Sequence, residues 1–249
     1  ERLLTRYAEL TETTLSDEVA RISPMEIICN DQVKLRACLQ REMQNASEQP
    51  SAWFQLANAT EALCRHFALN DLSPLGLSDE YKAGASAAGA LMRYLSETQK
   101  NALEHMTSLR IYQGSETMLL DRNTRRNLEL TESIRGRSRK GSLLWLLDKT
   151  STAMGGRLLR SWIEQPLVDE AKINRRLDAV GEFAQEHVLT MTLAEELQGV
   201  YDIERLLSKV AYKSMNARDC LSLCASLQKV PKIRELLREA KSQAVEEIR

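Results

Sequence analysis

The feature that most constrains this chain is a helical period that runs through residues 86–249. Apolar side chains recur there at spacings that place them on one face of a helix. The clearest stripe consists of Met154, Leu158, Leu159, Trp162 and Ile163. Only 10 glycines and 5 prolines occur in 249 residues, a low number for a loop-rich all-β fold. The pattern therefore predicts a mainly α-helical protein.

Polar residues at expected helix starts divide this region into separate helices. Asp121 or Asn123, Thr152, Asp169 and Asn216 each stand before an apolar stripe. Short polar side chains at such positions accept hydrogen bonds from the free N–H groups of the first turn. We therefore expect a helix to begin after each of these positions.

The end of the chain carries one more apolar stripe at helical spacing, which consists of Ile233, Leu236, Leu237, Ala240, Ala244, Val245 and Ile248. Pro231 stands where the first turn of a helix tolerates proline. We expect one helix over residues 231–249, roughly 30 Å long at ~1.5 Å per residue. Because no cap follows the stripe, the helix is expected to continue and the chain to be a fragment of a longer protein.

Residues 1–85 have a different pattern and predict a small α/β unit. Ser16–Ile22 is typical of a helix that ends before a proline, and Glu26–Cys29 of a short buried strand. Trp53–Leu56 is a second strand candidate, and a helix is expected from Asn58 to Asn70. Two strands do not make a stable sheet alone, so this unit is expected to be truncated at its N-terminal side.

Charge and composition exclude several classes of function. Lys+Arg 34 against Asp+Glu 35 give a formal net charge of −1, which excludes a basic DNA-binding coat over the whole protein. An aromatic content of 5% argues against a stacking platform for single strands. No apolar run approaches the length of a membrane span, and the N-terminus has no signal-peptide pattern. Five cysteines without C-x-x-C fit a reducing, intracellular protein.

The sequence offers no catalytic, ATP-binding or metal-binding residue. Gly136–Ser142 has the glycine spacing of a P-loop, G-x-x-x-x-G-K-[ST], but Ser142 and Leu143 replace the required Lys and Ser/Thr. Cys220 and Cys224 share a helix face, as two zinc ligands can, but no second pair accompanies them. They are predicted to be buried small hydrophobes. No Ser/His/Asp, Cys/His or paired-carboxylate arrangement rises above background.

One segment departs from the neutral charge of the chain. Residues 121–140 contain seven cations and three acids, a local charge of +4. Four of these cations lie in a loop from Arg135 to Gly141: Arg135 begins it, and Arg137, Arg139 and Lys140 lie in its flexible, glycine-flanked part, which is suited to phosphate contacts. They are our candidates for DNA binding. The alternative is a solvated loop, or arginines that pair with acids of a neighbouring domain.

Two further features are predicted to be structural. Gly155 and Gly156 fall in the first turn of a helix, where paired glycines suggest that another backbone passes close by. Trp145 and Trp162 lie on apolar stripes and are predicted to be core residues.

Three long motifs, in order, resemble the core domain of the MutS family of DNA mismatch repair proteins. They are Met118–Thr131 (MLLDRNTRRNLELT), Ser142–Leu167 (SLLWLLDKTSTAMGGRLLRSWIEQPL), and Tyr201–Val210 (YDIERLLSKV) followed by Asn216–Asp219. Upstream, Ile22–Ile28 and Ala88–Gln99 resemble the family's connector domain and its junction with the core. The similarity covers nearly the whole chain and is weakest before Ser16 and between Gln32 and Trp53.

The resemblance implies a truncated connector with ribonuclease-H-like α/β topology at residues 1–85. It also implies a helical core domain with the first lever helix at residues 86–249. The mismatch-reading Phe-x-Glu motif would lie before Glu1, and the clamp and P-loop ATPase after Arg249. The chain itself is therefore expected to be no enzyme and to hold no cofactor.

For the intact protein, the resemblance implies a homodimer that clamps mismatched duplex DNA and uses ATP with Mg to switch states. It implies a bacterial, cytoplasmic and nucleoid-associated protein that does not act at a membrane. The family's connector also resembles a docking surface for the partner protein MutL. By position, the helix from Thr60 to Asn70 is the candidate surface, with Glu61 and Arg65 among its exposed polar residues.

The function that follows is mechanical transmission. Long helices packed on a stable core can move as rigid bodies and relay ATP-driven changes between an ATPase and a DNA clamp. One alternative is a stand-alone helical protein-interaction module with this architecture. Another is an enzyme whose site is assembled from residues distant in sequence, which would require titratable side chains to converge in one pocket.

Overall fold

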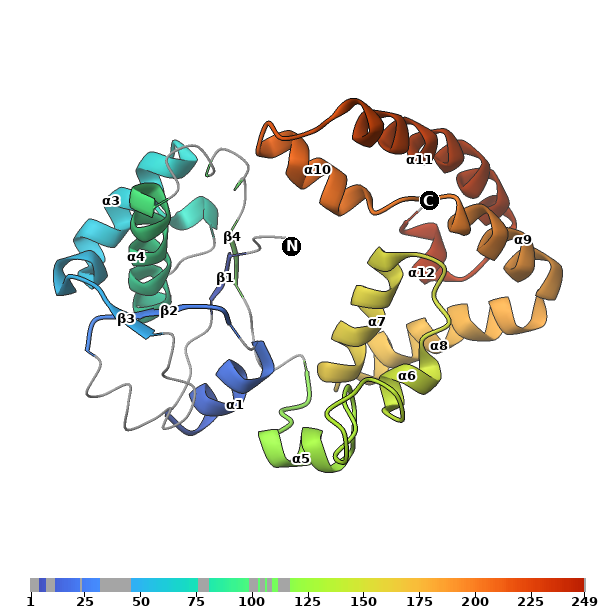
Figure 1. Cartoon of the computed structure of the whole chain (residues 1–249), viewed down its shortest axis with the longest axis horizontal. Coiled ribbons are helices and arrows are strands. Elements are labelled where there is room, and N and C mark those ends of the chain that lie inside the picture. Colours follow the sequence, from blue (N-terminus) through green and yellow to red (C-terminus); the bar gives the residue numbers. More distant parts are fainter. Residues whose placement is uncertain are drawn as a thin grey trace. The chain divides into compact units, whose positions relative to one another are not determined.

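A computed structural model of the chain describes residues 5–7, 12–22, 24–31, 46–75, 81–98, 103, 106, 109–111 and 117–248 (Figure 1). The chain forms two compact units, Arg2–Gly114 and Ser115–Arg249. This division lies later than the predicted boundary at residue 85, because the helix Lys82–Thr98 packs within the first unit. Helices dominate the described residues, as the sequence predicts.

The first unit combines short parallel strand pairs with helices. β1 (Thr5–Tyr7) pairs with β4 (Leu109–Ile111), and β2 (Ile27–Cys29) pairs with β3 (Ala46–Glu48). α1 (Glu12–Ile22) lies between β1 and β2 in the chain. The predicted short helix, the predicted strand that follows it and the α/β character of this part of the chain are therefore confirmed.

The predicted strand at Trp53–Leu56 is wrong. Ser51–Phe54 forms a 3₁₀ turn in which the N–H of Trp53 donates to the carbonyl of Pro50 (2.9 Å). α3 (Leu56–Phe67) follows at once, so it begins earlier than predicted.

The core of the first unit lies between α3 and α4 (Lys82–Thr98), which run side by side in Figure 1. Leu63 of α3 is fully buried and packs with Ala85, Ala88, Met92, Met106 and Leu109. Gly89 of α4 faces Ala59 of α3, and a Cβ at position 89 would lie 2.4 Å from the Ala59 Cα atom. The two helices therefore approach closely because residue 89 has no side chain.

The second unit is helical. Its helices are α5 (Arg122–Asn127), α6 (Leu143–Leu147), α7 (Ala153–Glu164), α8 (Glu170–Gln185), α9 (His187–Gln198), α10 (Ile203–Ala211), α11 (Ala217–Leu236) and α12 (Gln243–Glu246). Asp121, Thr152, Asp169 and Asn216 each accept a hydrogen bond from a first-turn N–H, which confirms the predicted helix starts. No described helix is both long and apolar enough to cross a membrane.

The predicted helix start at Pro231 is wrong, because α11 runs through this residue. The proline ring removes one backbone hydrogen bond from the helix. Lys229 and Lys232, on either side of the proline, both donate to the carboxylate of Glu196 in α9. This contact with α9 holds α11 on both sides of the proline.

The expected continuous helix to residue 249 is also wrong, because the chain turns back onto α8. After α11, Leu237–Glu239 forms a single 3₁₀ turn. The N–H groups of Lys241 and Ser242 then donate to the carboxylate of Glu182 in α8 (2.6 and 2.9 Å). α12 packs on α8 and buries Val245. The spacing of apolar residues in the sequence cannot predict this contact, because its two sides are about 60 residues apart.

The prediction that Trp145 and Trp162 are core residues is wrong. Trp145 is 48% exposed and Trp162 is 39% exposed. The guanidinium of Arg176 lies over the Trp162 ring, with its Cζ atom 3.9 Å from the ring centroid. The apolar stripes of α6 and α7 are therefore only partly covered within the described residues.

Gly155 and Gly156 make room for side chains of the preceding loop and not for a second backbone. A Cβ at position 155 would lie 3.1 Å from the Thr152 hydroxyl, and one at position 156 would lie 3.3 Å from the Thr150 hydroxyl. The prediction that another backbone passes close to these glycines is therefore wrong.

Charged side chains join the helices of the second unit. Arg157 of α7 donates to both carboxylate oxygens of Asp202 (2.7 and 2.8 Å) and to Glu204 of α10 (2.8 Å). These two acids raise the pKa of Arg157 above its ordinary value. Lys209 of α10 donates to Asp219 of α11 (2.7 Å). Ion pairs thus connect α10 both to α7 and to α11.

Candidate functional site

Four of the seven cations of residues 121–140 lie in a loop over residues 131–141, between α5 and α6, and this loop is ordered where the sequence predicts a flexible one. Its two ends are joined by backbone hydrogen bonds from Leu143 to Glu129 and from Leu144 to Leu130 (both 2.9 Å). Leu130 and Leu144 are buried beneath this junction. The loop is therefore closed at its base, and the prediction of a loop before residues 143–147 is confirmed.

Hydrogen bonds within the loop fix its path. The N–H of Ser133 donates to the carbonyl of Ser138 (2.9 Å), and the N–H of Arg137 donates to the carbonyl of Ser133 (3.0 Å). Arg137 and Gly141 have φ angles of 46° and 91°, so the chain reverses through left-handed conformations. The buried Ser142 then caps α6, since its hydroxyl accepts from the N–H of Trp145 (3.1 Å).

Arg139 is bound to an acid at the start of the next segment. Its guanidinium donates to the carboxylate of Asp148, which also accepts from the N–H and the hydroxyl of Thr150 (3.1 and 2.7 Å). The Thr150 hydrogen bonds, with a smaller effect of Arg139, hold the pKa of Asp148 below its ordinary value. Arg139 thus helps to position the loop.

The other three candidates differ from Arg139. Arg135, Arg137 and Lys140 are exposed, and within the described parts of the chain no hydrogen bond or ion pair engages their side chains. The structure therefore divides the four predicted cations into one that is paired and three that face solvent.

Asp148 is not among the candidates that sequence reasoning provides. The signal that points to it is an aspartate two residues before a threonine, the spacing at which an Asp side chain accepts from a nearby backbone N–H. That signal locates a turn but does not identify Arg139 as the partner.

A polar groove of 710 Å³ lies beside the loop, at the N-terminal end of α7. Three arginines line it, and each is paired with an acid: Arg139 with Asp148, Arg157 with Asp202 and Glu204, and Arg160 with Glu164. Because acids compensate these cations, the groove does not offer a net positive site to an anion.

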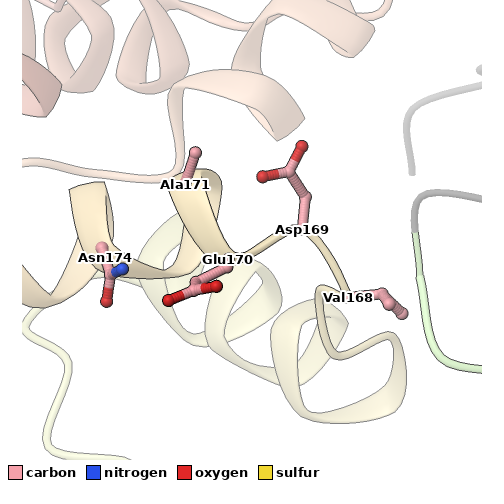
Figure 2. A pocket seen from close by; sticks show the side chains of 5 residues that line it. All are labelled: Val168, Asp169, Glu170, Ala171 and Asn174. Atoms are coloured by element: carbon pink, nitrogen blue, oxygen red, sulfur yellow. The ribbon is translucent and has the colours of Figure 1, made fainter.

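A second depression of 570 Å³ lies at the start of α8 and is shown in Figure 2. It is lined by Val168, Asp169, Glu170, Ala171 and Asn174. The side chains of Asp169 and Glu170 point to different sides of the helix in Figure 2, and Asp169 accepts the capping hydrogen bond from Lys172 (3.1 Å). The two carboxylates therefore do not converge on one point, and Asp169 serves as a helix cap.

Cysteine positions only partly follow the prediction. Cys29 is buried, and burial raises the pKa of its thiol. Cys220 and Cys224 are exposed, so their predicted burial is wrong. They line a shallow apolar groove on α11 with Met215, Leu223 and Leu227. Within the described ranges, no group of three or more His, Cys, Asp or Glu side chains could hold a metal ion.

The candidate MutL-contact residues lie on the outer face of α3. Arg65 donates to the carboxylate of Glu61, one helical turn away (2.6 Å). Their side chains are 78% and 66% exposed, respectively. The structure thus brings the two residues together as a solvent-exposed ion pair.

Comparison with known proteins shows the origin of this architecture. The pattern of MutS domain II matches residues 2–107, and the pattern of MutS domain III matches residues 123–249. The chain belongs to the MutS family. The two compact units thus correspond to the MutS connector and core domains, in the order found in the family.

Proteins named DNA mismatch repair protein MutS show the same relationship. The protein from Ruminiclostridium cellulolyticum is 43% identical over 91% of this chain, and the one from Halothermothrix orenii is 41% identical over 95% of it. The protein from Lachnoclostridium phytofermentans is 39% identical over 93% of it. The chain spans about a quarter of the length of these curated relatives, between 25% and 26%.

Proposed function

We propose that this chain forms the connector and core of a DNA mismatch repair protein, and that it transmits ATP-driven conformational change to a mismatch-binding DNA clamp. The observation that supports the proposal is how the helices of the second unit are connected to one another. Its helices are linked by charged contacts such as Arg157 with Asp202 and Glu204, and Lys209 with Asp219. Stiff helices connected by a few such contacts can change relative position as rigid bodies.

The intact protein then supplies what this chain does not. We propose that it binds mismatched duplex DNA, ATP and Mg, acts as a homodimer with MutL as partner, and works in the bacterial cytoplasm at the nucleoid. The printed name of the relatives, DNA mismatch repair protein, supports the mismatched-DNA part of this proposal. The chemistry of ATP hydrolysis is assigned to the intact protein and not to this chain.

Transmission is tested with Arg157→Met in the intact protein. This variant removes the contact between α7 and α10 but keeps the length of the side chain. We expect it to bind mismatched DNA and to hydrolyse ATP in the absence of DNA as the unmodified protein does. The change in ATP hydrolysis rate on addition of mismatched DNA should fall several-fold, because the two helices no longer move together.

Arg160→Met is the matched control. Arg160 lies one turn further along α7, and among the residues that the structure describes it pairs only with Glu164 of the same helix (2.9 Å). It should couple DNA binding to ATP hydrolysis normally. If Arg157→Met also couples normally while its α7–α10 contact is lost, transmission through the α7–α10 contact is refuted.

We further propose that the exposed Glu61–Arg65 pair of α3 contacts MutL. The support is its exposure on the outer face of the connector unit. The double variant Glu61→Arg and Arg65→Glu keeps an ion pair on the helix but reverses its direction. We expect weaker capture of MutL by the intact protein on mismatched DNA with ATP.

The control for this experiment is the equivalent reversal of an exposed pair elsewhere, Arg160→Glu with Glu164→Arg. It leaves the net charge unchanged, as does the reversal on α3. Equal MutL capture by the two double variants would rule out a contact at Glu61 and Arg65.

A further inference from the structure

The loop over residues 131–141 presents cations on an ordered frame. Backbone hydrogen bonds close its base at Glu129 and Leu130, and the bond between Ser133 and Ser138 fixes its interior. The carboxylate of Glu129 accepts a hydrogen bond from the N–H of Ile134 (2.6 Å), so this acid also stabilises the loop conformation. A loop that is ordered before binding loses less conformational entropy when it binds.

The charge on this frame is not balanced locally. Residues 131–141 contain four cations and one acid, Glu132, in a chain whose net charge is −1. Asp148 compensates Arg139. Arg135, Arg137 and Lys140 are exposed and have no acid partner within the parts of the chain that the structure describes. Three cations therefore remain for a partner that carries negative charge at several points.

We propose that Arg135, Arg137 and Lys140 bind the phosphate backbone of duplex DNA, and that Arg139 holds the loop in place and does not bind DNA. A row of phosphates suits three cations on a short loop, since each cation can neutralise one phosphate and release counterions. The contact positions the duplex without reading its sequence, because Lys and Arg that reach only phosphates carry no base information. This inference rests on the duplex-DNA binding proposed above for the intact protein, and its test does not depend on transmission through the second unit.

The test is the salt dependence of binding by the full 249-residue chain to a duplex DNA oligonucleotide. Three phosphate contacts predict that log K falls against log[salt] with a slope of about −2.7, or roughly 40-fold from 50 to 200 mM salt. The triple variant Arg135→Gln, Arg137→Asn, Lys140→Gln should lose most of this dependence. Asparagine is used at position 137 because it tolerates the left-handed backbone there.

The control removes the same net charge from cations that are already paired. Arg65→Gln, Arg160→Gln and Arg175→Gln each break an exposed ion pair and leave the loop intact. This triple variant should keep the slope of the unmodified chain. The single variant Arg139→Gln should also keep it, measured at a temperature where circular dichroism shows the chain folded.

Two results overturn the proposal. Equal losses of slope in the loop variant and the control variant mean that only net charge matters. No measurable binding by the unmodified chain at 50 mM salt means that the three cations face a different partner, such as acids elsewhere in the intact protein.

Discussion

At the scale of single residues, Gly89 has the tightest surroundings among the glycines that the structure describes in this way. A Cβ there would meet three atoms of Ala59: Cα at 2.4 Å, Cβ at 2.5 Å and the carbonyl oxygen at 2.5 Å. Two of these are backbone atoms, which cannot rotate away as a side chain can. The close contact between α3 and α4 therefore requires glycine at position 89, where the side chain is a single hydrogen atom.

We predict that Gly89→Ala destabilises the chain. Alanine gains up to about 1 kcal/mol from its higher helix propensity. Overpacking against a backbone costs roughly 1–3 kcal/mol and more where neither helix can shift, so the loss exceeds the gain. Urea denaturation should show a lower free energy of unfolding.

Gly181→Ala provides the comparison, since no atom lies within 4 Å of a Cβ placed there in the middle of α8. It should leave stability unchanged or raise it by up to about 1 kcal/mol. Similar unfolding free energies for both alanine variants would mean that the α3–α4 contact is looser than described.

At the scale of elements, the carboxylate of Glu182 in α8 holds two backbone N–H groups of the segment that follows α11. The hydrogen bond from the Lys241 N–H, with the bonds from Ser242, lowers the pKa of Glu182. A carboxyl whose pKa is lower in the folded state stabilises the fold above its unfolded pKa, about 4.3. That stabilisation is lost as the pH falls through the folded pKa.

We predict that Glu182→Gln lowers the melting temperature at pH 7 and that its difference from the unmodified chain shrinks below about pH 4. Thermal melts followed by circular dichroism between pH 3 and pH 7 measure this difference. Glu186→Gln is the control, because Glu186 is exposed and its side chain does not cap a helix. A difference for Glu182→Gln that is constant with pH would contradict the role of its charge.

The elements also show what sequence reasoning can and cannot reach. The helix starts at Asp121, Thr152, Asp169 and Asn216 were predictable, because a cap and its first turn are neighbours in the chain. The passage of α11 through Pro231 was not, because Glu196 of α9 supplies contacts on both sides of the proline from a distant part of the sequence.

The candidate site also has features that the sequence predicts and features that it does not. The position of the basic loop and its four cations followed from glycines and local charge. The difference between Arg139 and its three neighbours did not, because it depends on Asp148 and on the turn that holds it. The exposure of Trp145 and Trp162 likewise depends on which helices cover α6 and α7. The spacing of apolar residues predicts a helix face but not the helix that packs on it.

At the scale of the whole chain, the two units are stabilised in different ways. The first has an apolar core around Leu63. The second contains fewer buried apolar residues and joins its helices through ion pairs such as Arg157–Asp202. Exposed ion pairs contribute about 0.2–1 kcal/mol each, whereas a fully buried leucine contributes about 1.5–3 kcal/mol. Ion pairs can therefore be exchanged at a lower free-energy cost than buried leucine contacts, as the proposed transmission requires.

The close approach at Gly89 also restricts how this sequence can change over generations. Replacing Ala59 by glycine would remove the methyl group but leave its Cα and carbonyl oxygen in place. No single substitution at the facing position can therefore compensate for a side chain at residue 89. A side chain at residue 89 therefore requires α3 and α4 to move apart, and this restriction on the sequence follows from backbone geometry alone.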